Sequence, residues 1–338
     1  MDDVGAVRGR LWRGGELVAE EFDFEQISTY LQDDTCLIWV DLCGPGEQLL
    51  SRLAGELSLD PQAVEDSIAH AERAKATRYA SHVFLTAYAT KLLDRGENSR
   101  IGRNRSGLSV ARVSAFVFPH GVITVRTSPD FDLEPVITRW DDNADLIKYG
   151  VGALVHGLLD VIVDSHFETV QALDDEMENL EDILFDERTI SGQVQRRTYE
   201  IRKDLVQLRR VILPMREVVN GVLRHRKDRQ AAPELDSWYD DLYDHVLRAS
   251  EWTESLRDMV TTIFETNLSL QDTRLNTVMK KLTAWAAIIA IPTAITGYFG
   301  QNVPYPGYEK AWGFALSTAV IVGVAGALYT SFKRQGWL

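Results

Sequence analysis

The order of apolar and polar residues divides the chain into an α/β part, a helical part and a membrane part. Up to about residue 150, runs rich in β-branched and aromatic residues alternate with helical stretches, which predicts a mixed α/β sandwich. A helix is expected at Pro61–Ala71, with Asp60 as its N-cap. The expected strands are Leu37–Leu42, Val83–Thr90, Ala111–Phe118 and Val122–Thr127, with a hairpin at Pro119-His120-Gly121 between the last two.

From Gly152 onward the pattern changes to long amphipathic helices, because apolar residues recur every three to five positions. The first helix is expected to end near Leu184, and a second runs over about residues 193–226 with a kink expected at Pro214. A third begins near Leu235 and has no convincing stop before Gly297, which makes it roughly 90 Å long at about 1.5 Å per residue. We therefore expect a cytoplasmic α/β domain over residues 1–150, antiparallel helices over 151–234 and a stalk helix over 235–281.

Two uncharged apolar runs follow the stalk, Leu282–Gly300 with 19 residues and Ala311–Phe332 with 22. Each is long enough to cross a hydrocarbon core of roughly 30 Å, so together they predict a hairpin of two membrane helices. The outer loop covers residues 301–310, and a basic tail covers 333–338. Because Lys280-Lys281 and Lys333-Arg334 flank the spans, both termini are expected to be cytoplasmic, below a cell membrane.

Composition narrows the function further. The chain has 25% charged residues and a formal charge of −14, so the part before the spans is expected to fold in water. This acidic balance argues against nucleic acid as a partner, because phosphate contacts need clustered Lys and Arg. Cys36 and Cys43 form no disulfide or metal framework, and no cleaved signal peptide is expected. The sequence has no Walker loop, nucleophile elbow or zinc-protease motif, so neither an enzyme nor a nucleotide-driven pump is expected.

Small and polar residues share one face of the first span. Such a face either packs closely against another helix or lines a pore. Two spans from one chain cannot enclose a pore, so transport requires an oligomer. The second span has Ala319, Gly323 and Ala327 at four-residue spacing, which suits close packing on a neighbouring helix. The face on the first span contains Asn276, Met279 or Lys280, Thr283, Ala287, Ala290, Thr293 or Ala294, Gly297 and Gln301.

The C-terminal run MKKLTAWAAIIAIPTAITGYFGQNVPYPGYEKAWGFALSTAVIVGVAGALYTSFKRQGWL resembles the membrane hairpin of the CorA family of divalent-cation channels. In that family a Gly-Met-Asn signature follows an aromatic residue at the end of the first span. The counterparts are Phe299 and Gly300-Gln301-Asn302. The segments DPQAVEDSIAHAERAKATRY, LRRVILPMREVVN and YDDLYDHVLRASEWTESLRDMVTTIFETNLS also resemble family segments, in family order from about residue 57 onward.

This resemblance implies a funnel-shaped homopentamer in the lipid bilayer, with five first spans around a pore for Mg²⁺ and also Co²⁺ or Ni²⁺. Gly300, Gln301 and Asn302 would form the selectivity filter, where neutral oxygens accept hydrogen bonds from the hydrated ion without stripping its water. Polar pore positions would be Asn276 and Thr293, next to Gly297.

The resemblance also implies a gate and charged rings along the pathway. Met279 and Leu282 match its hydrophobic constriction, which closes by dewetting, although ordinary packing between stalk helices is the alternative. Glu265 is either an acidic ring near the inner pore or an exposed stalk charge. Glu309 in the outer loop either concentrates cations at the mouth or is simply solvated.

A regulatory metal site is implied by the same resemblance. Glu65 and Asp66 match the family's acidic pair, and Asp241 matches their partner in the neighbouring subunit. Mg²⁺ between these carboxylates would hold the closed state, and its loss would shift the population toward the open state. From the residues alone, Glu65 and Asp66 are only the polar face of a short helix. Asp240 and Asp244 are further candidates for this role.

The departure from the signature is Gln301, which replaces a methionine. The zinc-carrying ZntB branch of the family also varies at this position, so a zinc transporter of the same architecture is an alternative, with Zn²⁺ as the ion. A membrane-anchored sensor or scaffold is another, and the direction of transport stays open.

Two further features are interpreted as structural rather than functional. The acidic run Asp174–Glu187 is expected to be a solvated helix face rather than a cation sink. The histidines show no ligand spacing on one helical turn, so they are interpreted as surface or packing residues, namely His156, His166, His225 and His245.

Overall fold

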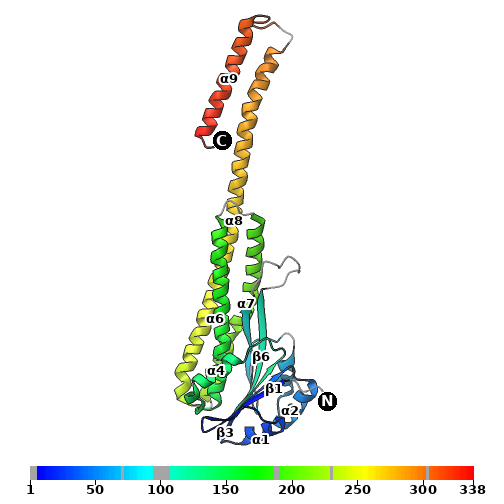
Figure 1. The fold of residues 1–338 in the computed structure, drawn as a ribbon, viewed down its shortest axis with the longest axis vertical. Helices are drawn as coiled ribbons and strands as arrows, with labels where there is room; N and C mark the ends of the chain where they lie inside the picture. The colour runs from blue at the N-terminus through cyan, green and yellow to red at the C-terminus, as the bar shows by residue number, and fades with distance from the viewer. Residues whose placement is uncertain (1–5, 70–71, 94–106, 186–190, 229–230, 302–303) are drawn as a thin grey trace. The chain divides into compact units, whose positions relative to one another are not determined.

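The computed structural model describes residues 6–69, 72–93, 107–185, 191–228, 231–301 and 304–338. The chain divides into two compact units, Met1–Thr262 and Ile263–Leu338, and Figure 1 shows the elements of each. The first unit holds a β-sheet, the helices up to α7 and the first part of α8. The second unit holds the rest of α8 and the last helix, α9.

The sheet of the first unit has the strand order β2-β1-β3-β7-β6-β5-β4. Its central pair, β3 and β7, is parallel, with Ile38 opposite Gly121, and the other neighbouring pairs are antiparallel. The predicted hairpin is confirmed, because Phe118 of β6 lies opposite Gly121 of β7. The strands are β1 (Ala6–Arg13), β2 (Glu16–Ala19), β3 (Cys36–Cys43), β4 (Lys75–Arg78), β5 (Val83–Leu92), β6 (Leu108–Phe118) and β7 (Gly121–Arg126).

The sequence pattern did not predict three of the strands, β1, β2 and β4. In β1 the arginines Arg8 and Arg10 interrupt the apolar pattern, yet Arg10 is buried, where its guanidinium pairs with Asp141 at 2.6 Å. The other two strands have four residues each and lie at the edges of the sheet, half-buried or exposed. They therefore lack the continuous apolar runs that mark the central strands.

Successive residues of β3 enter two different cores, one on each face of the sheet. Leu37 and Trp39 join the core that is covered by α4 (Glu134–Asp142), α5 (Ala144–Ile147), α6 (Val151–Leu184) and α7 (Ser191–Asp228). Ile38 and Val40 join the opposite core, with side chains from η1 (Phe24–Gln26), α1 (Ile27–Gln32), α2 (Glu47–Leu57) and α3 (Pro61–Ile68). The predicted α/β sandwich is confirmed.

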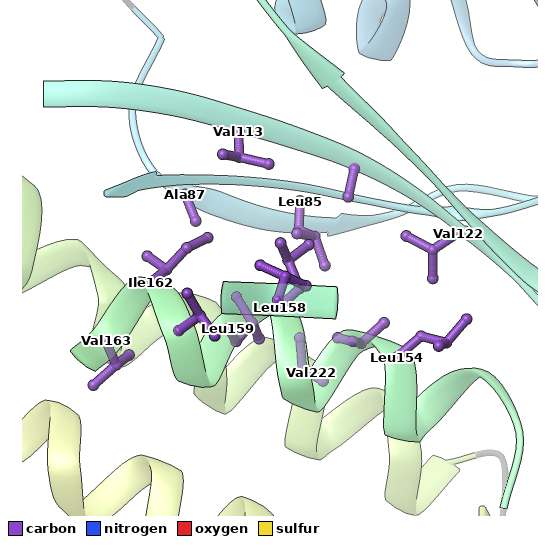
Figure 2. Close-up of a cluster of buried hydrophobic side chains, with 14 of the residues drawn as sticks. Leu85, Ala87, Val113, Val122, Leu154, Leu158, Leu159, Ile162, Val163 and Val222 are labelled. Carbon is purple, nitrogen blue, oxygen red and sulfur yellow. The ribbon is translucent and has the colours of Figure 1, made fainter. Parts of the chain in front are cut away.

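The core between the sheet and α6 holds the long helices in place, as Figure 2 shows. Leu85, Ala87 and Val113 come from the strands and face Leu158 and Ile162 of α6. All five are at most 1% exposed. Because complete burial of a Leu or Ile side chain stabilises a fold by about 1.5–3 kcal/mol, this packing anchors α6 firmly on the sheet.

The long helices agree with the predicted ones to within two residues at each end. The helix α7 continues through Pro214 to Asp228, and after η2 (Pro233–Leu235) the helix α8 spans Asp236–Phe299. The short helix α3 is a correction. Asp60 caps it as predicted, accepting a hydrogen bond from the Gln62 backbone N–H at 2.9 Å, but it ends at Ile68 because Ala69 has an extended backbone.

The second unit contains two helices that are long and apolar enough to cross a membrane, α8 in its last part and α9 (Ala311–Arg334). In the part of α8 that follows Leu282, Ala284 is buried, and the half-buried positions continue from it at three- and four-residue spacing, namely Ala287, Ile288, Ile291, Pro292, Ile295 and Phe299. On α9 the corresponding stripe is Gly313, Ser317, Ile321, Ala325 and Leu328. The small residues Ala319, Gly323 and Ala327 lie elsewhere on α9 and are exposed, so they are not packed within the described chain.

Candidate functional site

The predicted pore-facing residues lie on an uncovered face of α8. Met279 is 58% exposed and Leu282 is 64% exposed, and Asn276, Thr293 and Gly297 are exposed as well. On an ideal helix these five residues lie on average roughly 160° from the Ala284–Ile295 stripe, on the opposite side of the helix. The face that carries the candidate pore residues is therefore free of contacts from the described part of its own chain.

Hydroxyl groups on this part of α8 are satisfied by the helix itself. The Thr293 Oγ1 donates to the Ile289 carbonyl at 3.2 Å, and the Thr296 Oγ1 donates to the Pro292 carbonyl at 2.7 Å. Such local bonds let a threonine sit in an apolar environment without an unpaired donor. The hydroxyl oxygen can still accept a hydrogen bond, so Thr293 offers a polar surface to water or a hydrated ion.

Gly300 and Gln301 lie at the C-terminal end of α8. The Gly300 N–H donates to the Thr296 carbonyl at 2.8 Å, and the Gln301 N–H reaches the Tyr298 carbonyl at 3.4 Å. Asn302, the third residue of the predicted filter, lies outside the described residues. A helix C-terminus presents unpaired carbonyls and a partial negative charge, so the end of α8 is electrostatically favourable for a cation.

The connection from α8 to α9 is held by aromatic contacts and by a close backbone approach. The Tyr305 ring lies against Phe299 with 5.0 Å between centroids and against Tyr308 with 5.3 Å. Gly307 has a φ of +90°, and a Cβ there would lie 2.8 Å from the Gly313 Cα, so the backbones meet without side chains between them. Glu309 is exposed beside this turn, with a φ of 62°.

The predicted regulatory carboxylates on α3 differ in their surroundings. Glu65 is exposed, whereas the Asp66 side chain is 13% exposed and accepts a hydrogen bond from the Lys75 Nζ at 2.7 Å. The same ammonium lies 3.0 Å from Glu72. The charge of Asp66 is therefore balanced within the chain by Lys75.

Asp241 lies in the first turns of α8 and is 69% exposed in its side chain. Its carboxylate is 3.6 Å from the His245 Nε2. Among the described residues of one chain, Asp241 makes no ion pair or hydrogen bond with Glu65 or Asp66. The structure of one chain thus leaves these predicted partners apart.

A second carboxylate cluster was missed by the sequence prediction. Asp160 and Asp164 of α6 and His245 of α8 offer ligand atoms that all lie within 4.8 Å of one another, a donor set that suits a divalent metal. His245 was predicted to be a surface or packing residue, because 85 positions separate it from Asp160 in the sequence. The i,i+4 spacing of the two aspartates was the one local signal.

Arg139 of α4 already neutralises this cluster. Its guanidinium donates to Asp160 and, at 2.6 Å, to Asp164. Burial raises the pKa of Asp160 above its ordinary value, while the guanidinium opposes that rise. A metal ion at this cluster would have to displace Arg139 or share the two carboxylates with it.

Comparison with known proteins gives the fold and the family. The chain matches the family described as CorA-like Mg²⁺ transporter protein over residues 34–334. The cobalt/magnesium transport protein CorA of Thermotoga maritima is 27% identical over 322 residues, which cover 94% of this chain and 87% of that protein. The zinc transport protein ZntB of Yersinia pseudotuberculosis is 25% identical over 291 residues, covering 82% of this chain and 81% of the other. The solved structure of the CorA magnesium transporter from Methanocaldococcus jannaschii aligns with a TM-score of 0.71, at 23% identity, over 98% of both chains.

These matches extend from the sheet to α9. The mixed-sheet unit, the long helix α8 and the two candidate membrane helices agree with the fold of the Methanocaldococcus structure. The relatives are ion transporters rather than enzymes, and their names differ in the ion. The chain therefore belongs to the CorA-like Mg²⁺ transporter family and is a membrane protein that transports divalent cations.

Proposed function

We propose that this chain is one subunit of a homopentameric channel whose pore is lined by α8 and which conducts hydrated Mg²⁺. The observation that carries the proposal is the exposed face of α8 with its small and polar residues, which lies across the helix from a less exposed stripe. Two spans per chain cannot surround a pore, so several copies must contribute this face. Five copies is the number that the family resemblance implies.

The filter in this proposal is the ring of Gly300, Gln301 and Asn302. Mg²⁺ gives up its water reluctantly, so neutral oxygens that accept hydrogen bonds from that water select the ion and still release it. The partial negative charge at the C-terminus of α8 adds to the attraction. The role of Asn302 rests on the family resemblance, and those of Gly300 and Gln301 also rest on their place at the helix end.

The gate in this proposal is an apolar constriction made by Met279 and Leu282. A ring of exposed apolar side chains expels water from a narrow pore and so blocks a hydrated ion. Polar rings at Asn276 and Thr293, with Gly297 between larger residues, would carry the ion past the gate. Glu265 lies on the same face of the ideal helix, so five copies would place an acidic ring below the gate.

Cytoplasmic Mg²⁺ closes the channel in this proposal. The ion would bind between Glu65 and Asp66 of one subunit and Asp241 of the next, and so favour the closed state. Two observations support this role: Glu65 and Asp241 are exposed, and Asp66 is the residue that follows Glu65 in α3. Both termini would lie in the cytoplasm because basic residues flank both spans, and Glu309 would face outward.

A zinc transporter of the same architecture is the second candidate. It is favoured by Gln301 in place of the signature methionine and by the similarity to ZntB. Both candidates predict the same fold, so only the transported ion separates them. In the first candidate the channel is expected to conduct Co²⁺ and Ni²⁺ as well, but Mg²⁺ is the ion that identifies this candidate.

The test is cation uptake by purified full-length protein in lipid vesicles, with Mg²⁺, Co²⁺, Ni²⁺ and Zn²⁺ compared side by side. Mg²⁺ flux that Asn302→Ala abolishes, and that the matched variant Thr318→Ala on α9 leaves intact, is the expected result. Zn²⁺ flux without Mg²⁺ flux would replace the first candidate by the second. No cation flux at all would favour a membrane-anchored sensor or scaffold instead.

A further inference from the structure

A groove rich in arginine lies in the first unit, between α7 and α8. Its volume is about 760 Å³, and five guanidinium groups line it, those of Arg73, Arg202, Arg209, Arg210 and Arg257. Its other lining residues are mainly apolar and include Leu205, Val206 and Val260. Val206 is 42% exposed there, so the groove offers apolar area beside its charges.

The groove carries positive charge that the described part of its own chain leaves largely unbalanced. Glu254 accepts a hydrogen bond from Arg209 and lies 2.9 Å from Arg257, so one carboxylate serves two arginines. Asp258, 3.8 Å from Arg257, adds a second carboxylate. Arg73, Arg202 and Arg210 have no hydrogen-bond or ion-pair partner in the part of the chain that the structure describes. A negatively charged surface with some apolar character would fit this groove.

The same chain presents such a surface at the end of α6. From Glu168 to Phe185 the sequence contains seven carboxylates and no Lys or Arg. Glu176 is paired with Arg197, at 2.8 Å, whereas other acidic side chains point into solvent, namely Asp175, Glu178, Glu181 and Asp182. Ile183 and Phe185 are 44% and 68% exposed beside them, so the face combines negative charge with apolar area.

This acidic face cannot fill the groove of its own chain. The opposite side of α6 is fixed in the core through Leu173, Met177 and Leu180, which are at most 2% exposed. With α6 held there, its acidic face is solvent-exposed while the arginine groove is also open. The complementary charges can therefore meet only between different copies of the chain.

We propose that the acidic face of α6 in one copy docks into the arginine groove between α7 and α8 of the next. The contact joins two different surfaces, so it is head-to-tail and continues from copy to copy, as a closed ring requires. The inference rests on the proposed function, because the proposed pore needs such a ring, and it identifies the surfaces that hold the ring together. Electrostatic complementarity then fixes the register of neighbouring subunits.

A charge-swap experiment on the full-length protein in detergent tests this docking. The groove variant is Arg202→Glu with Arg210→Glu, and the helix variant is Glu178→Lys with Glu181→Lys. Each is expected to raise the protein concentration needed for assembly at least tenfold in native mass spectrometry. The combined variant is expected to recover most of the loss. The control is Arg216→Glu, a single charge reversal at an exposed position of α7 outside the groove, and it should have little effect.

Three outcomes would overturn the docking. One is a combined variant that assembles no better than the groove variant. Recovery of assembly in the combined variant would also show that misfolding does not cause the loss, because this variant carries all four substitutions. Another is a groove variant no weaker than Arg216→Glu. The third is an unchanged oligomer together with loss of inorganic polyphosphate binding, which would make the groove a small-anion site. A wild-type protein that is monomeric yet folded would instead refute the proposed channel itself, so the two failures are distinguishable.

Discussion

The pair formed by Asp41 and Arg126 offers the sharpest test of how the first unit is held together. The two residues lie on the parallel strands β3 and β7, at the centre of the sheet. Their side chains are 2% and 9% exposed. The Asp41 carboxylate accepts hydrogen bonds from the Arg126 Nε at 3.0 and 3.1 Å and from its terminal nitrogen at 2.6 Å. We predict that Asp41→Asn strongly destabilises the unit.

The magnitude follows from what the substitution leaves behind. In Asp41→Asn the guanidinium keeps its hydrogen bond to the Phe131 carbonyl at 2.8 Å but loses its charged partner while still buried. Removing one partner of a buried pair costs about 3–5 kcal/mol. A domain of this kind has about 5–15 kcal/mol of stability in total, so the loss is a large share of it. Replacing both residues with leucine removes the unpaired charge, so the double variant should lose much less.

Urea unfolding of the full-length protein in detergent measures this effect. The Trp39 indole N–H donates to the Thr124 hydroxyl at 3.1 Å, and that hydroxyl donates to Asp41 at 2.7 Å, so tryptophan fluorescence reports on the same network. The matched control is Glu134→Gln, which removes the charge of the exposed Arg8–Glu134 pair and should cost about 1 kcal/mol or less. A loss below about 1 kcal/mol for Asp41→Asn, or a double variant less stable than the single one, would refute the reasoning.

Three further predictions address regulation, pH and the gate. Lys75→Met removes the cation that balances Asp66, so half-inhibition of flux should occur at a lower internal Mg²⁺ concentration. Asp241→Ala should instead raise flux at high internal Mg²⁺. Flux into vesicles at graded internal Mg²⁺ concentrations measures both effects. Burial lowers the pKa of His166 from 6.5 to about 4, so the stability it contributes is complete above pH 6.5 and falls by about 3 kcal/mol as the pH drops toward 4. His166→Asn should flatten that part of the urea midpoint plotted against pH. Leu282→Ala removes side-chain volume from the proposed constriction and should increase Mg²⁺ flux severalfold. Unchanged flux would mean that the gate is not at Leu282.

The sequence predicts those parts of the fold in which local pattern and burial agree. Strands β3 and β7 are buried on nearly every residue, so they appear as apolar runs, and α6 shows its apolar stripe for the same reason. Strand β1 is not predicted, because its buried residue Arg10 has its charge balanced by Asp141, which is 131 positions away in the sequence. No local pattern contains that information.

The candidate site likewise has a part that the sequence predicts and a part that it does not. The exposed face of α8 follows from helical periodicity, since the residues that share it recur every three or four positions. The Asp160–Asp164–His245 cluster depends on packing of α6 against α8, and the balance of Asp66 by Lys75 depends on the contact between the end of α3 and the start of β4. Both arise from tertiary contacts, which a residue pattern does not encode.

These contacts bear on how a cation sensor can work in this protein. At both candidate cation sites in the described part of the first unit, carboxylates converge on a basic side chain of the same chain: Lys75 for Asp66 and Glu72, and Arg139 for Asp160 and Asp164. A divalent ion that binds at either place must displace the basic group or share the carboxylates with it. Either event opposes binding, because like charges are brought together in a partly desolvated site. Such a site fills only at a higher cation concentration than a bare carboxylate pair would. Weak binding of this kind would suit the proposed channel, which should close only once the internal cation has accumulated, because a tight site would hold it shut.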